Sequence, residues 1–406
     1  MILGYISILR SYWPMLLFGL VTVFFGNFGQ SFFISWYGAS LQAELGLSAS
    51  AYGTAYSAAT LVSGLIIMAI GGLIDRVSVR LFATVVACGL ILAALLMWQV
   101  NSLFSLVIAL FLLRFCGQGL LPHTAITTMG RYFSLNRGKA ISLAVNGVPL
   151  GEMILPSLIV LIIAWVGWQQ SWLVIALAIG LIYLPLAHWL LSRAGPSEVE
   201  LQGMEKRLRS EDLPDGSRRT VLKDGRFWRA LPLLLTPGFV VTGVFIHQGF
   251  ILPEKGWSPA LFATAFIAYG AVHWLGALVT GSLVDRFSAV RLMPLIGGPF
   301  VLGLGLTAWL EGQWVVYLMM TLFGIGFGMI GTIMNALWAE VYGTTHLGAI
   351  RSLITAFGVV STAMSPILLG VMIDAGVGVN ALLLSMAILA FLASLLALSS
   401  YRYGRL

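Results

Sequence analysis

Two charged side chains lie inside long apolar stretches of the sequence, where ionisable groups are costly and usually functional. Arg114 falls within the apolar segment 103–130, and Glu152 falls within 138–164. A guanidinium stays protonated, and its fork of N–H donors matches a carboxylate or a phosphate. Arg114 is therefore a candidate binding group for an organic anion. The alternative is a permanent structural pair with Glu152 or with backbone carbonyl groups.

Glu152 is the first candidate for proton coupling, because a carboxylate can take up and release a proton. The alternative is a fixed counter-ion to Arg114. His273 is the second candidate, because histidine titrates near neutral pH, although an ordinary hydrogen-bonded histidine remains open. Gln118 follows Arg114 by one helical turn, and Gln248 matches Gln30 by its sequence pattern. The side chains expected to contact a solute are Arg114, Gln118, Asn27, Gln30, His247, Gln248 and His273.

The elements that carry these groups must cross a membrane. Of the 406 residues, 59% are hydrophobic and only 9% are charged, against about 25% charged in a typical soluble domain. So few charges cannot cover a soluble protein of this size, which excludes a soluble fold. A membrane-spanning helix needs about 20 apolar residues. We expect twelve, near 13–38, 52–74, 79–101, 103–130, 138–164, 170–192, 229–252, 260–283, 289–310, 313–338, 346–372 and 378–401.

The positive residues sort to one side of these segments. Apart from Lys255 and Arg114, every Lys and Arg falls at a terminus or in alternate connections, including the long central loop. Positive residues favour the cytoplasmic side. The sequence therefore predicts a multi-pass protein of the plasma (bacterial inner) membrane, with both termini in the cytoplasm.

An internal repeat divides the chain into halves. Asp75 and Asp285 lie 210 residues apart in matching stretches, 71–78 and 281–288. Each half has six expected spans, so both enter the membrane from the same side, as in parallel repeats. We expect a six-helix bundle at 1–192, a charged cytoplasmic linker at 193–228 and a second six-helix bundle at 229–406.

Several kinds of chemistry have no signature in the sequence. It contains no phosphate-binding loop, nucleotide fingerprint, nucleophile elbow or metal-ligand spacing. We therefore expect no enzyme activity, no cofactor, no metal and no nucleic-acid partner. The expected partners are a small-molecule substrate, protons and membrane lipid, and we expect a monomer.

The repeated stretch resembles a motif of the major facilitator superfamily. Its residues are Gly71, Asp75, Arg76 and Arg80, with the copy Gly281, Asp285, Arg286 and Arg291. The resemblance implies an all-α membrane protein of two six-helix bundles related by a pseudo-two-fold axis. It also implies cytoplasmic gating networks, in which Arg131 pairs with Asp75 and Glu340 pairs with Arg286. The expected gate residues are Asp75, Arg76, Arg131, Asp285, Arg286 and Glu340.

A finer resemblance concerns the branch of the family. The stretches 25–30, 132–133 and 137–140 are similar to those of prokaryotic members close to the monocarboxylate and oxalate/formate branch. The resemblance implies secondary active transport of a small organic solute by alternating access. We favour an organic anion with proton-coupled symport. The alternative is proton-driven efflux of drugs or amphipathic metabolites, and a more remote one is a non-transporting membrane sensor.

Overall fold

The protein is a bundle of membrane-spanning helices. A computed structural model describes residues 2–133, 136–195, 216–343 and 347–401. Within these ranges twelve helices are long and apolar enough to cross a membrane, so the predicted all-α multi-pass fold is confirmed. The spans are Arg10–Gly29, Ala49–Ile74, Val79–Trp98, Leu103–Tyr132, Arg137–Val166, Trp168–Arg193, Gly225–Ile246, Pro259–Phe287, Ala289–Trp309, Trp314–Tyr342, Ile350–Asp374 and Val379–Leu398. Most of the predicted linker 193–228 falls at 196–215, outside the described residues.

The helices pack into two compact units. Unit 1 comprises Met1–Ser40 and Ala58–Leu208, and unit 2 comprises Leu41–Ser57 and Arg209–Leu406. The second span therefore starts in unit 2 and ends in unit 1 as one continuous helix.

The elements of the first half of the chain form unit 1, apart from residues Leu41–Ser57, which belong to unit 2. In chain order they are α1 (Ile2–Gly26), η1 (Asn27–Gly29), α2 (Ser31–Ile34), η2 (Ser35–Tyr37), α3 (Gly38–Leu45), α4 (Ala49–Ile70), η3 (Gly71–Asp75), α5 (Val79–Trp98), α6 (Leu103–Leu112), η4 (Leu113–Leu120), α7 (Leu121–Tyr132), α8 (Arg137–Val145), α9 (Gly147–Val166), α10 (Trp168–Ala178), η5 (Ile179–Tyr183) and α11 (Leu184–Arg193). Helix α1 packs against α7 and α8, and α5 packs against α10.

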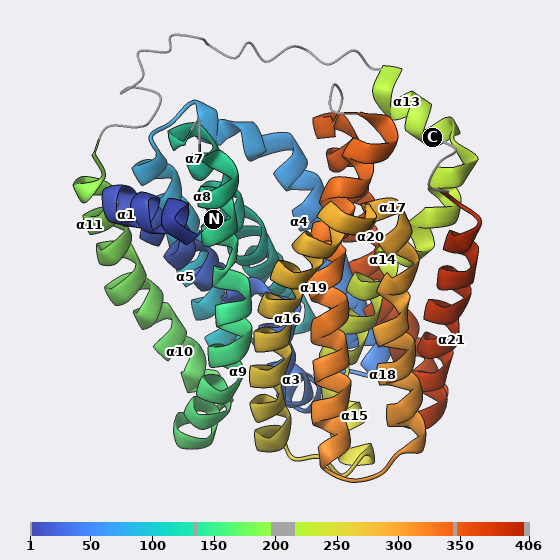
Figure 1. The fold of residues 1–406 in the computed structure, drawn as a ribbon. Helices are drawn as coiled ribbons and strands as arrows, with labels where there is room; N and C mark the ends of the chain where they lie inside the picture. Colours follow the sequence, from blue (N-terminus) through green and yellow to red (C-terminus); the bar gives the residue numbers. More distant parts are fainter. Residues whose placement is uncertain (1, 134–135, 196–215, 344–346, 402–406) are drawn as a thin grey trace. The chain divides into compact units, whose positions relative to one another are not determined.

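The second half forms most of unit 2. Its elements are α13 (Gly216–Lys223), α14 (Gly225–Ile246), α15 (Gln248–Glu254), α16 (Pro259–Phe287), α17 (Ala289–Leu292), η6 (Met293–Ile296), α18 (Gly297–Trp309), α19 (Trp314–Tyr342), α20 (Leu347–Asp374) and α21 (Val379–Leu398). Within this unit α16 lies beside α19, and α18 lies beside α21 (Figure 1).

Short polar signals set the helix ends. Ser78, Ser102 and Ser258 are N-caps, and each side chain accepts a hydrogen bond from a backbone N–H in the first turn. Such caps satisfy donors that have no partner within their own helix. Gly167 joins α9 to α10 with a φ of 85°, a conformation that glycine adopts without the steric cost of a Cβ atom.

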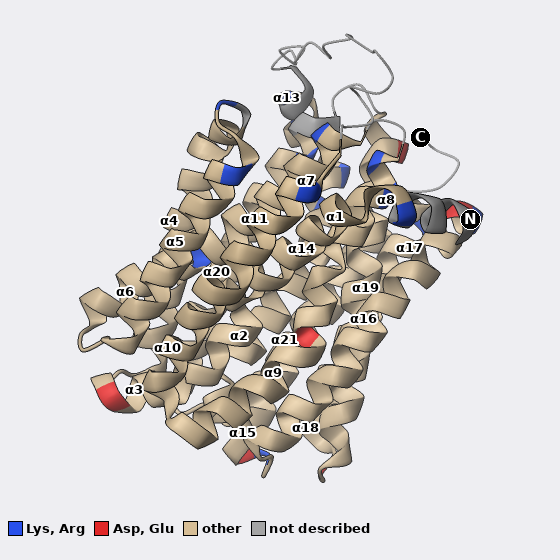
Figure 2. Cartoon of the chain, turned by 90° about the vertical axis from the view of Figure 1, so that its left-hand side faces the viewer, with Lys and Arg blue, Asp and Glu red and all other residues tan. Residues whose placement is uncertain are grey.

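Charged residues mark helix ends in both units. Lys and Arg residues lie mainly near the ends of the helices, whereas the helix middles are almost entirely uncharged (Figure 2). Arg131, Arg193 and Arg286 each lie in the last turn of their helix. Charge in the interior of a span is therefore the exception, and the two cases singled out by the sequence lie in unit 1.

Candidate functional site

The first span is broken at Gln30. Between η1 and α2 this residue is extended, with φ −78° and ψ 153°. The N–H groups of Phe33 and Ile34 both donate to the Gln30 carbonyl. The Gly29 carbonyl has thus lost the donor, Phe33 N–H, that a continuous α-helix would supply. A backbone acceptor freed in a buried segment needs a new donor.

Arg114 supplies that donor. Its Nη1 donates to the Gly29 carbonyl at 3.0 Å, and its Nε donates to Thr60 Oγ1 at 3.0 Å. The residue is only 3% exposed and lies in the π-helical segment η4, a local irregularity that is frequent at functional sites. The structure therefore shows Arg114 in contact with a backbone carbonyl, one of the alternatives that the sequence leaves open. It also places a buried positive charge at the break.

The broken span and η4 are in backbone contact. A Cβ atom at Gly29 would lie 2.0 Å from the Leu113 carbonyl oxygen and 2.5 Å from Gln118 N. A Cβ atom at Gly117 would lie 2.7 Å from Gly29 N. Only glycine permits this approach. The contact brings the backbone of half-buried Gln118 to the break.

The fifth span reaches the same place. Asn27 is fully buried, and its Nδ2 donates to the Gly147 carbonyl at 2.9 Å. Its Oδ1 has no hydrogen-bond partner among the described residues. A Cβ atom at Gly151 would lie 2.0 Å from Asn27 Nδ2, so the side chain of Asn27 rests on this glycine. Glu152 follows directly and is only 4% exposed.

The seventh span has a corresponding break. Helix α14 ends at Ile246, and α15 begins at Gln248 after His247. His247 is 2% exposed, and its Nε2 donates to the Pro366 carbonyl at 2.8 Å. Gln248 is also buried, at 3% exposure. Discontinuous spans commonly form transport sites near the middle of a membrane.

His273 has a different setting. It lies on α16 in unit 2, half-buried, with Tyr269 and Phe327 beside its ring at centroid distances of 6.0 and 5.7 Å. Helix α19 approaches closely here, because a Cβ atom at Gly324 would lie 3.2 Å from His273 N. The predicted solute and proton residues thus divide between the units. Unit 1 gathers Asn27, Gln30, Arg114, Gln118 and Glu152, whereas unit 2 holds His247, Gln248 and His273.

The first gate segment is held through its backbone. The side chain of Asp75 lies outside the described part of the structure, and Arg76 is exposed. Arg131 Nη1 donates to the Ile74 carbonyl at 3.1 Å. His123 Nε2 donates to the Gly71 carbonyl at 2.9 Å, a contact that the sequence did not predict. Two side chains of α7 therefore fix η3, which carries the family motif.

The second gate segment differs from the prediction. Glu340 does not pair with Arg286 among the described residues. Its carboxylate accepts hydrogen bonds from Ser288 Oγ at 2.6 Å and from Ala289 N at 3.0 Å, so it caps α17. The Arg286 guanidinium lies over the Phe287 ring, 5.1 Å from its centroid. The predicted pairing is wrong because the N–H groups at the start of α17 lie nearer to Glu340 and need an acceptor.

A hollow of about 450 Å³ adjoins this capped turn. The charged or polar residues that line it are Asp285, Arg286, Ser288, Arg291 and Glu340. Asp285 and Arg286 are exposed. The repeated motif thus borders a polar depression in unit 2.

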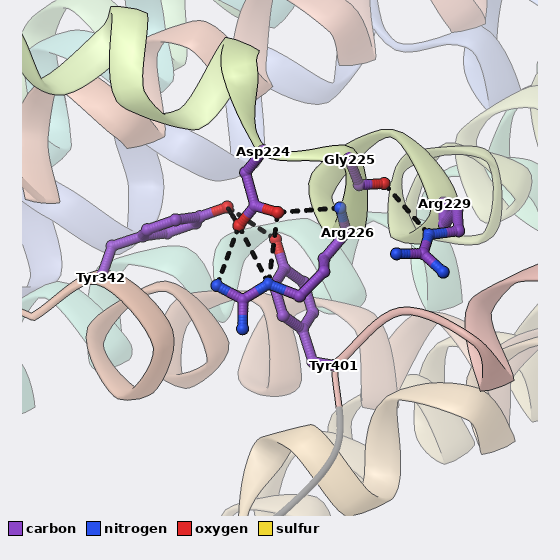
Figure 3. Close-up of polar contacts among 6 residues, drawn as sticks. All are labelled: Asp224, Gly225, Arg226, Arg229, Tyr342 and Tyr401. Carbon is purple, nitrogen blue, oxygen red and sulfur yellow. Dashed lines mark hydrogen bonds and ion pairs between the residues drawn. The ribbon is translucent and has the colours of Figure 1, made fainter. Parts of the chain in front are cut away.

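A further polar cluster ties three parts of unit 2 together (Figure 3). Asp224 caps α14 by accepting from Arg226 N at 2.8 Å, and it pairs with Arg226 Nη2 at 3.1 Å. Tyr342 donates to Asp224 Oδ2 at 3.0 Å, and its hydroxyl lies 2.7 Å from that of Tyr401. Burial raises the pKa of Asp224, but hydrogen bonds from Arg226 and Tyr342 outweigh it and leave the pKa below its ordinary value. Burial raises the pKa of Tyr401 to about 12.

Sequence patterns predict little of this cluster. The end of the linker, the end of α19 and Tyr401, three residues after α21, are far apart in the sequence. A polar residue just before the apolar run at Gly225 was the one local signal for the cap, since Asp is a preferred N-cap.

Known proteins resemble this chain over most of its length. The family model of the Major Facilitator Superfamily matches residues 16–249 and again residues 238–403. The MFS-type transporter pynF of Aspergillus niger is 25% identical over 235 residues, which are 56% of this chain and 50% of the relative. The chain therefore matches about half the length of this curated relative.

Solved structures share the fold. A mutant of the nucleoside transporter NupG superposes with a TM-score of 0.71 at 12% identity, covering 96% of this chain and 100% of the other. A bacterial homolog of the human lysosomal transporter Spinster, inward-facing and occupied, gives a TM-score of 0.72 at 14% identity, covering 98% and 99%. At such identities the likeness concerns the fold alone. Because the family model covers nearly the whole sequence, the chain belongs to the Major Facilitator Superfamily, a family of membrane transporters and not of enzymes.

Proposed function

We propose that this secondary transporter moves a small organic anion together with a proton by alternating access. The observation that carries the proposal is the burial of Arg114 at the break of the first span, where it bonds the Gly29 carbonyl. A positive charge away from water attracts an anion more strongly than one at the surface, because the local dielectric constant is lower. The preferred solute is a monocarboxylate or a compound of similar size and charge.

The break itself supports a binding role. Non-helical backbone inside a membrane is tolerated where it is buried in protein or lines a water-filled cavity. Polar groups of three spans lie at the break: the side chain of Asn27 in η1, the backbone N–H of Gln118 in η4 and the Gly147 carbonyl of α9. The Oδ1 atom of Asn27 remains without a partner among the described residues. A solute with a hydrogen-bond donor is a fitting partner for it.

Glu152 is the proposed proton carrier. It is 4% exposed and lies in the same unit as Arg114. Protonation would remove its negative charge from the surroundings of a bound anion. Anion binding would in turn favour the protonated form, and this mutual dependence is the basis of symport.

The proposed location is the plasma membrane with both termini in the cytoplasm. Positive residues at helix ends support it, since they favour the cytoplasmic side. Asp75, Arg76, Arg131, Asp285, Arg286 and Glu340 are the proposed gate residues on that side. Each of their segments is held by a hydrogen bond between a side chain and the backbone. Arg131 Nη1 donates to the Ile74 carbonyl, and Ala289 N donates to the Glu340 carboxylate.

The test is transport into proteoliposomes with an imposed pH gradient, comparing small carboxylates with cationic dyes. We expect carboxylate-dependent proton movement that is lost in Arg114→Ala and in Glu152→Gln. Arg229→Ala is the matched control, because this exposed arginine also bonds a carbonyl, that of Gly225 at 3.2 Å. Two results together would favour the efflux alternative and overturn the proposal. The unmodified protein would transport no carboxylate, and Arg114→Ala would still transport dyes.

A folding control accompanies these variants. Arg114→Lys keeps the charge but loses the bidentate fork. We expect it to fold and to transport with a raised KM. If Arg114→Lys and Arg114→Ala lose transport while a carboxylate still raises the melting temperature of both equally, Arg114 does not bind the anion.

A further inference from the structure

Two tryptophans from different spans lie against each other on the surface of unit 1. Helix α1 lies beside α11 (Figure 1), and the rings of Trp13 and Trp189 meet there with centroids 5.7 Å apart and planes tilted by 52°. Both side chains remain exposed, at 43% and 44%. Exposed tryptophans of membrane proteins are enriched where headgroups meet acyl chains. The pair therefore marks the depth of the membrane interface on this side of unit 1.

A positive charge lies over one of these rings. The Arg193 guanidinium carbon is 5.7 Å from the centroid of the Trp189 ring. Arg193 is exposed in the last turn of α11 and has no acidic partner within the described ranges. Four residues separate it from Trp189, a rise of about 6 Å along a helix, and the interfacial layer on each side of a bilayer is about 5–8 Å thick. Arg193 thus lies at the height of the lipid phosphates when Trp189 lies at the base of the headgroups.

The helices around this pair carry positive charge without negative charge. The sequences of α1, α5 and α11 each contain one arginine, and they contain neither Asp nor Glu. These arginines are Arg10, Arg80 and Arg193, and all three are exposed. Basic residues next to a membrane attract anionic lipids. The charge of this surface therefore favours an anionic headgroup over a zwitterionic one.

Two hydrogen bonds fix α11 beside α5 at the same end. The Thr84 hydroxyl donates to the Arg80 carbonyl at 2.7 Å, and His188 Nε2 lies 2.7 Å from the same hydroxyl oxygen. Because a hydroxyl group has one proton, His188 Nε2 is the donor in the second bond. Trp189 is the next residue of α11. The turn that carries Trp189 is therefore held in place by the protein alone.

Exposed apolar side chains continue from the two tryptophans toward the middle of their spans. On α1, Leu17 follows Trp13 by four residues and is 36% exposed. Pro185 on α11 and Ile182 in η5 precede Trp189 by four and seven residues, and both are exposed. Residues at such spacings share one face of a helix. A lipid whose phosphate lies at Arg193 would have its acyl chains along these side chains.

We propose that an anionic phospholipid of the surrounding membrane binds at this surface of unit 1. The surface consists of Trp13, Leu17, Ile182, Pro185, Trp189 and Arg193. The Arg193 guanidinium donates to the phosphate, whose geometry matches its fork of N–H groups. The tryptophan rings pack against the glycerol and the upper acyl chains. The bound lipid stabilises the contact between α1 and α11, whichever solute the protein carries.

The test measures lipid binding to the purified chain in neutral detergent by native mass spectrometry. The probes are phosphatidylglycerol and phosphatidylcholine with identical acyl chains. We expect the first phosphatidylglycerol to bind with the lower Kd. Arg193→Gln removes one positive charge and should raise that Kd about 5-fold, the equivalent of about 1 kcal/mol. The Kd of phosphatidylcholine should not change.

Further variants separate the lipid contact from general effects of charge and apolar area. Arg193→Lys keeps the charge and should retain most of the affinity. Trp189→Ala removes apolar contact and should raise the Kd of both lipids. The matched controls are Arg229→Gln, which removes an exposed arginine of unit 2, and Trp165→Ala, which removes an 87% exposed tryptophan of α9. Both controls should bind phosphatidylglycerol as the unmodified protein does, and melting curves without lipid check that each variant folds.

Two results would overturn the lipid site. One is a phosphatidylglycerol Kd that is the same in Arg193→Gln, in Arg229→Gln and in the unmodified protein. The other is equal thermal stabilisation by phosphatidylglycerol and by inorganic phosphate, which would indicate an ion site without a lipid. A failure of carboxylate transport would contradict the proposed function and leave these lipid affinities unchanged. The two proposals therefore fail separately.

Discussion

The bond between Arg114 and Thr60 gives a sharp prediction. Thr60→Val removes the oxygen that accepts from Arg114 Nε at 3.0 Å and nearly preserves the side-chain volume. Arg114 is 3% exposed and Thr60 is 4% exposed, so water cannot readily replace the lost acceptor. A hydrogen bond to a charged group contributes about 1.5–3 kcal/mol. We expect Thr60→Val to lower the free energy of unfolding by that amount.

The expected shift is measurable by thermal unfolding in detergent. The entropy of unfolding is about 2.1 cal/mol/K per residue, so a loss of 1 kcal/mol lowers the Tm of a chain of 406 residues by about 1 °C. Thr60→Val should therefore lower Tm by ~2–4 °C. Thr60→Ser retains the hydroxyl and should lower Tm much less. Equal melting of Thr60→Val and the unmodified protein would refute the reasoning, and so would equal damage by Thr60→Ser.

Three other changes have defined outcomes. Gly151→Ala places a Cβ atom 2.0 Å from Asn27 Nδ2, so overpacking should lower the free energy of unfolding by about 1–3 kcal/mol, measured by thermal unfolding. The pKa of Asp224 is lower in the folded protein than its ordinary value of 3.8. The ionised carboxylate therefore stabilises the fold above pH 3.8, and this stabilisation is lost as the pH falls through the pKa of the folded protein. The Tm difference between the unmodified protein and Asp224→Asn, measured at a series of pH values, should shrink as the pH falls below 3.8. Ser288 has a φ of 74°, which strains any residue other than glycine. Ser288→Gly and Ser288→Ala both lose the hydroxyl, but only glycine relieves this strain. The free energy of unfolding of Ser288→Gly should therefore exceed that of Ser288→Ala by about 1–2 kcal/mol, which thermal unfolding would show as a higher Tm.

Matched changes control these three measurements. Gly138→Ala adds a Cβ atom with no neighbour within 4 Å and should leave Tm nearly unchanged, unlike Gly151→Ala. A constant Tm difference for Asp224→Asn down to pH 3 would contradict the assigned hydrogen bonds, and equal melting of the two Ser288 variants would contradict the strain.

The twelve spans were predictable because hydropathy depends on composition alone. The structure places them with shifts of a few residues at most ends, as in Val79–Trp98 against the expected 79–101. The first and seventh spans differ most, since the expected 13–38 and 229–252 each contain a break. Nothing in the apolar runs marks these breaks, because Asn27 and His247 are compatible with a helix when their neighbours are apolar.

The contacts of the candidate site were less predictable. The sequence placed Arg114 and Glu152 in the membrane, but not the carbonyl that Arg114 bonds. That acceptor exists only because the backbone turns at Gln30, which depends on the packing of Gly29 against another span. Glu340 shows the same limit. Its negative charge led to the prediction of a pair with Arg286. In the structure its carboxylate instead accepts a hydrogen bond from Ala289 N at the start of α17.

The backbone contact between η1 and η4 also limits how the site can vary. Because Gly29 and Gly117 lie against backbone atoms of the facing segment, neither position tolerates any side chain without separating the two spans. A saturation library selected for transport should therefore retain glycine at both positions whichever solute is supplied. Changes of solute preference should instead arise at Gln30 and Gln118, which are half-buried and touch the same break. The site thus combines a backbone contact that cannot change with a few side chains that can be substituted.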